Sequence, residues 1–120
     1  MSGVPTVMDL DARRKADRSI AEDRRAARRD YVRHSEEAAK EDLAYRKTKA
    51  IKLVEYRAAG EPAGVAQIRA EADAAEHRMK RDIAASLAKA SLLKVEESER
   101  EATVVRDIHR TSERIDGLSP

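Results

Sequence analysis

Nine basic residues between Arg13 and Arg33, against four acidic ones, are the group in this chain best placed to bind a ligand. At about 100° per residue, five of them share one side of a helix, over an arc of about 100°. They are Arg14, Arg18, Arg25, Arg29 and Arg33, here called the Arg face. Arginines at this spacing can bind nucleic-acid phosphates in a salt-dependent way. Two other interpretations stay open: binding the acids of a partner protein, or a solvated face with i,i+4 ion pairs from Asp17 or Glu22.

The three histidines favour no metal site. Asp30 with His34 and Asp73 with His77 are i,i+4 pairs that could share a hydrogen bond. Metal sites in helical bundles prefer Glu-x-x-His turns, and neither that spacing nor H-x-x-x-H occurs here. The chain also has no cysteine, no Gly-rich phosphate loop and no nucleophile elbow. We therefore expect no metal, no cofactor and no enzymatic activity.

The three tyrosines, Tyr31, Tyr45 and Tyr56, project to one side of the first helical run. They could stack on bases or anchor a neighbouring helix. Because they are the only aromatic residues of the chain, packing between helices is the favoured use.

Glycine and proline divide the chain once, at Gly60-Glu61-Pro62-Ala63-Gly64. Neither residue type occurs between Asp9 and Ala59 or between Val65 and Asp116, so two long helices are predicted. Gly60 is placed to end the first in the left-handed conformation, and Pro62 to open the second. A link this short makes the helices antiparallel neighbours. The first helix is expected to begin near Thr6 or Val7.

The amino-acid composition is typical of helices that bury only a narrow stripe of apolar residues. Of the 120 residues, 40% are charged and 2% aromatic, which is typical of long helices and coiled coils. The prediction is an all-α, elongated antiparallel hairpin or coiled coil, oligomeric because two helices bury little surface. No apolar run is long enough to span a membrane, and the basic side is too poor in bulky residues to insert. A cytoplasmic location is expected, in the host cytoplasm if a phage encodes the protein, with the virion left open.

The apolar residues form two stripes on roughly opposite sides of the first helix. A weak stripe runs through Ala16, Ile20, Ala27, Tyr31 and Ala38. A stronger one begins at Leu43 and is expected to pack against the second helix. Nothing between His34 and Glu41 breaks a helix, so one continuous helix is favoured, with halves that contact different partners. The expected segments are a flexible lead (1–8), an Arg-rich helical arm (9–42), a helical hairpin (43–116, with its turn at 60–64) and a tail (117–120).

The residues expected to pack or self-associate are the bulky members of these stripes. They are Leu43, Ile51, Val54, Ile68, Met79, Ile83, Leu87, Val104 and Ile108. In the second helix the stripe Val65, Ile68, Ala72, Ala75, Met79, Ile83, Leu87 and Ala90 has coiled-coil-like steps of three and four. It is expected to pack on residues 43–58.

Four short motifs carry a resemblance to a protein family. They are Tyr45-Arg46-Lys47-Thr48-Lys49-Ala50, Ala59-Gly60-Glu61-Pro62, Gln67-Ile68-Arg69-Ala70-Glu71-Ala72 and Ser86-Leu87-Ala88-Lys89-Ala90. In this order they resemble small helical phage proteins, early-gene products encoded beside recombination or replication functions. The resemblance covers residues 45 to about 115 and implies no functional residue. Together with the Arg face, the missing catalytic motifs and the expected oligomerisation, it favours a non-enzymatic, oligomeric accessory to DNA metabolism. The alternatives are a virion or scaffold component and a small inhibitor that binds one host protein.

Overall fold

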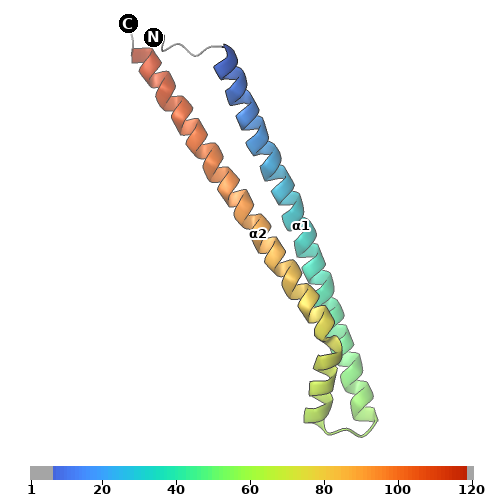
Figure 1. Cartoon of the computed structure of the whole chain (residues 1–120). Helices are drawn as coiled ribbons and strands as arrows, with labels where there is room; N and C mark the ends of the chain where they lie inside the picture. The colour runs from blue at the N-terminus through green and yellow to red at the C-terminus, as the bar shows by residue number, and fades with distance from the viewer. Residues whose placement is uncertain (1–6, 119–120) are drawn as a thin grey trace. The chain divides into compact units, whose positions relative to one another are not determined.

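The computed structural model describes residues 7–118, and these form two helices. Helix α1 runs over Val7–Ala58 and helix α2 over Ala63–Leu118 (Figure 1). The described residues contain no strand, so the predicted all-α helical hairpin is confirmed. Of the predicted lead and tail, residues 1–6 and 119–120 lie outside the described part of the chain, while residues 7–8 and 117–118 are helical.

Helix α1 ends at Ala58, and the backbone conformation of Gly60 caps it. Gly60 has a φ of 91°, and its amide donates to the carbonyl of Arg57 (3.0 Å). The amide of Glu61 donates to the carbonyl of Tyr56 (3.1 Å), which completes a Schellman motif. The carbonyl of Pro62 then accepts the first hydrogen bond of α2, from the amide of Ala66 (2.9 Å). The role predicted for Gly60 is confirmed. Pro62 stands one residue before α2, and not within its first turn as predicted.

The turn has fewer residues than the predicted 60–64, because Gly64 lies within the first turn of α2. Gly60 and Gly64 can therefore be compared by the same substitution, one in the turn and one in a helix. Gly60→Ala should destabilise the hairpin by about 1–2 kcal/mol, the cost of a left-handed non-glycine residue. Gly64→Ala should stabilise it by about 0.5 kcal/mol, because alanine is the better helix former.

Urea denaturation followed by circular dichroism measures both substitutions. A Cβ at either position would have no neighbour within 4 Å, so the difference isolates backbone conformation. Equal effects of the two substitutions would contradict a left-handed Gly60.

The chain divides into two compact units. Residues 30–90, here the turn unit, hold the end of α1, the turn and the start of α2. The terminal unit pairs α1 up to Arg29 with α2 from Ser91. Helix α1 runs without a break through residues 34–41, as favoured from the sequence.

In the turn unit, the buried residues at the contact between the helices are small residues of α2. The buried residues of α2 are Ala66, Ala70, Ala74, Ala84 and Ala88. From α1, Ala38, Tyr45 and Thr48 are half-buried at seven- and three-residue steps. Alanine has no side chain beyond Cβ, so this seam allows the two backbones to approach closely.

The prediction that the bulky stripe of α2 packs on residues 43–58 is wrong. Ile68, Met79, Ile83 and Leu87 are exposed, and so are Leu43, Ile51 and Val54 of α1. At 100° per residue, Met79 lies on the side of α2 opposite Ala70 and Ala74. Since the bulky residues and the alanines lie on opposite sides of α2, only one group can face α1. The alanines are the group that does so.

In the terminal unit, the buried residues are again small. Ala27 of α1 and Ser91, Val95 and Ser98 of α2 are buried. Arg28 forms an ion pair with Glu99 (3.1 Å) across the two helices. Val104 and Ile108, which the sequence marked for packing, are exposed. The sequence assigned them to a segment that projects or packs on another copy, so their self-association stays a prediction.

Candidate binding surfaces

Four members of the Arg face lie in the terminal unit, and all four are exposed. Arg14, Arg18, Arg25 and Arg29 occupy the side of α1 opposite the buried Ala27 by helical geometry. Among the residues that the structure describes, none of the four has an ion pair within 4 Å. Asp17 and Glu22, the expected i,i+4 partners, likewise form none with described residues. No described side chain therefore keeps an external anion from the four guanidinium groups.

Two of the neighbouring arginines differ from these four. Arg33 lies in the turn unit, where it is exposed and pairs with Asp30 (3.5 Å). Arg24 is half-buried on the side toward α2, and its Nε has no hydrogen-bond partner. A solvated face with ion pairs along one helix thus describes Arg33, but not Arg14, Arg18, Arg25 and Arg29.

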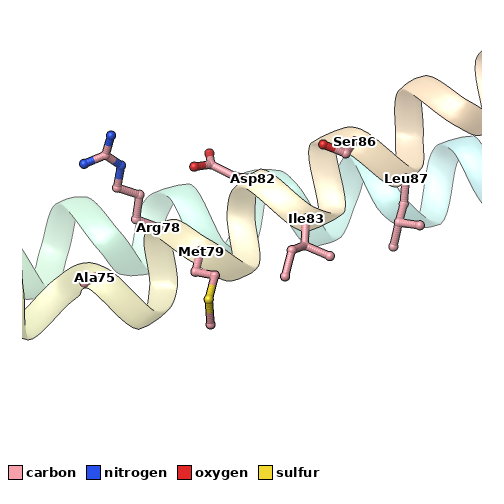
Figure 2. A pocket seen from close by; sticks show the side chains of 7 residues that line it. All are labelled: Ala75, Arg78, Met79, Asp82, Ile83, Ser86 and Leu87. Atoms are coloured by element: carbon pink, nitrogen blue, oxygen red, sulfur yellow. The ribbon is translucent and has the colours of Figure 1, made fainter.

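The outer stripe of α2, defined as residues 65, 68, 72, 75, 79, 83, 87 and 90, is the longest exposed apolar surface of the turn unit. Exposure reaches 69% at Ile68 and 58% at Met79. Around Met79 the stripe borders a shallow concavity of about 510 Å³. Figure 2 shows Met79, Ile83 and Leu87 projecting to one side of α2, with Arg78, Asp82 and Ser86 along the other edge.

Two further groups of residues that the sequence marked for packing or self-association form exposed apolar surfaces. On α1 of the turn unit, Leu43 and Val54 are each 68% exposed and Ile51 lies beside them. On α2 of the terminal unit, Val104 and Ile108 line a concavity of about 490 Å³ with Thr111. The structure therefore leaves every bulky residue named for self-association at the surface.

The contact between the helices of the turn unit is edged by polar pairs that the sequence interpretation missed. His77 Nδ1 lies 2.8 Å from a carboxylate oxygen of Glu41, rather than against Asp73. Arg81 donates to Asp42 (2.9 Å) and lies over the ring of Tyr45 (5.2 Å). The hydrogen bonds to Asp42 and Asp82 raise the pKa of Arg81.

Tyr56 makes a similar link near the turn. Its hydroxyl donates to Asp73, and this hydrogen bond raises the pKa of the phenol. Arg69 lies over its ring (5.0 Å) and pairs with Glu61 in the turn. Tyr45 and Tyr56 thus serve helix contact, the use favoured from the sequence, whereas Tyr31 is exposed. A heptad projection of both helices would have placed these side chains beside the seam.

We also looked for a metal site and a membrane-spanning helix among the described residues. In the described part of the chain, no three His, Cys, Asp or Glu side chains gather closely enough to hold a metal ion. His34 Nδ1 is buried without a hydrogen bond and lies 4.0 Å from Glu37. Within residues 7–118, neither helix has a segment both long and apolar enough to cross a membrane. No protein-family model, curated protein or solved structure matches the chain.

Proposed function

We propose that this protein is a non-enzymatic, self-associating helical protein that binds nucleic-acid phosphates through Arg14, Arg18, Arg25 and Arg29. The observation that carries the proposal is the lack of ion pairs at these four exposed arginines with any described residue. A cation already neutralised by its own chain has less to gain from a phosphate. The bidentate guanidinium fork suits phosphate oxygens.

The proposed cellular role is an accessory to DNA metabolism in a phage. It rests on the resemblance of residues 45 to about 115 to phage early-gene products, together with the Arg face. Self-association supports the same role, because two or more copies place two or more sets of arginines on one nucleic acid.

Binding to a labelled duplex over a series of salt concentrations tests the proposal. Four phosphate contacts predict that log K falls with log salt with a slope of about −3 to −4 per chain bound. A scrambled duplex of the same length should bind equally, because phosphate contacts carry no sequence information. Affinity that does not change with salt would contradict the proposal.

A virion or scaffold component is the second candidate. It is favoured by the two exposed apolar stripes of the turn unit, on α1 and α2, both turned away from the seam. If the α1 stripe of one copy packs on the α2 stripe of the next, the contact is head-to-tail and can grow without closing. Electron microscopy of the purified protein distinguishes the two: filaments favour the scaffold, and small closed oligomers favour the accessory.

A further inference from the structure

We infer that the outer stripe of α2 pairs with the same stripe of a second copy, antiparallel, about a two-fold axis beside Met79 and Lys80. This inference rests on the proposed self-association and specifies its surface, direction and register. The stripe from Val65 to Ala90 is about 38 Å long at 1.5 Å per residue.

The sizes of the side chains match in this register. About such an axis Met79 meets Met79, while Ala75 opposes Ile83 and Ala72 opposes Leu87 of the other copy. Ile68 opposes Ala90 in the same way. Small residues thus face large ones along the contact, the arrangement that lets helices interdigitate. A parallel pair would instead place alanine on alanine and isoleucine on isoleucine.

The charges along one edge of the stripe match about Lys80, one residue from the Met79 centre of the apolar pairs. Arg78 and Asp82 lie two residues before and after Lys80, and Glu71 and Lys89 lie nine residues before and after it. In an antiparallel pair, like edges of the two helices face each other, so Arg78 meets Asp82 and Glu71 meets Lys89. Figure 2 shows Arg78 and Asp82 on this shared edge.

The ion pairs that Asp82 and Glu71 form within one chain do not prevent this pairing between two copies. Asp82 is exposed and touches Arg81 of its own helix (3.1 Å), while Glu71 pairs with Lys49 (3.3 Å). A carboxylate accepts several hydrogen bonds, so each can take a second cation. Matching of size about Met79, and of charge on one edge about the adjacent Lys80, suits a closed two-fold contact, because each surface must be complementary to itself.

Cysteine cross-linking tests the pairing directly, because the chain has no cysteine of its own. In Met79→Cys, the two copies bring their Cα atoms to about 5 Å for helix axes about 9 Å apart, within disulfide range. Ile68→Cys is the matched control at a more exposed position of the same stripe. Its two copies lie about 35 Å apart in this arrangement.

Mild oxidation should therefore link Met79→Cys to itself and leave Ile68→Cys unlinked. An equal mixture of Ile68→Cys and Ala90→Cys should form the mixed disulfide. Self-linking of Ile68→Cys would overturn the antiparallel arrangement.

Light scattering on the reduced variants separates this inference from the proposed self-association. An oligomer in which Met79→Cys does not link would overturn the outer-stripe contact but leave self-association standing. A monomer would overturn both, and a dimer with the expected links supports both.

Charge reversal provides a second measurement. Arg78→Glu should weaken the dimer about tenfold, because it places like charges together twice across the axis. Arg78→Glu combined with Asp82→Arg should restore the affinity, because the two positions then carry opposite charges again, with the signs exchanged. Failure of the second change to rescue the first would overturn the assigned register.

Discussion

The variant Arg14→Glu, Arg18→Glu, Arg25→Glu should bind a short duplex at least about a hundredfold more weakly than the unaltered protein at low salt. It removes three of the four proposed phosphate contacts and replaces each with a repelling carboxylate. The salt slope should also fall by about 1 for every arginine that is replaced. Anisotropy of a labelled duplex over a salt series measures both quantities.

The α2 helix offers a matched control for this variant. Arg100, Arg110 and Arg114 are also exposed residues of the terminal unit. Their triple reversal changes the net charge by the same amount, from +2 to −4. If net charge alone attracts DNA, both variants will lose affinity equally, and that result would contradict a binding face on α1. Unchanged helical content by circular dichroism shows that neither variant has unfolded.

Ala74→Leu should destabilise the hairpin by about 1–3 kcal/mol, the second large effect that we expect. Ala74 is 0% exposed in the contact between α1 and α2. A leucine there must push the two helices apart or adopt a strained rotamer. Alanine and leucine have similar helix propensities, so the loss reports packing rather than local helix formation.

Ala72→Leu is the control, two residues away on the exposed outer stripe. It should leave the free energy of unfolding of the hairpin nearly unchanged and can strengthen self-association. Urea denaturation at several protein concentrations separates these effects, because only association depends on concentration. Greater damage from Ala72→Leu than from Ala74→Leu would mean that the bulky stripe, and not the alanine seam, meets α1.

The fold was predictable from the sequence because its determinants are local. A single Gly-Glu-Pro break between two long runs of good helix formers leaves few alternatives to a helical hairpin. Gly60 ends α1 with a positive φ for the reason the sequence offers, namely that glycine adopts this conformation at little cost.

The face that each helix presents to the other was not predictable by following the bulkiest residues. Hydrophobic periodicity identifies a stripe that needs covering, but it does not say whether the same chain or another copy covers it. The signal for the internal contact lies in small residues. From Ala70 to Ala88, steps of three and four through Ala74, His77, Arg81 and Ala84 continue without interruption. The bulky stripe, by contrast, gives way to Glu96 and Glu97.

The position of the Arg face was predictable from the sequence, but its ion pairing was not. Spacing alone puts Arg14, Arg18, Arg25 and Arg29 on one side of a helix. Whether nearby acids neutralise them depends on rotamers and on the neighbouring helix. Arg28 finds Glu99, a residue 71 positions away, and no helical spacing rule would identify that partner.

Light scattering coupled to size exclusion, with and without a short duplex at low and moderate salt, measures self-association and duplex binding in one experiment. We expect a mass of at least twice the 13.4 kDa of one chain. We also expect co-elution with the duplex at low salt that is lost at moderate salt. A folded 13.4 kDa monomer that elutes apart from the duplex at both salts would contradict both self-association and phosphate binding by the Arg face.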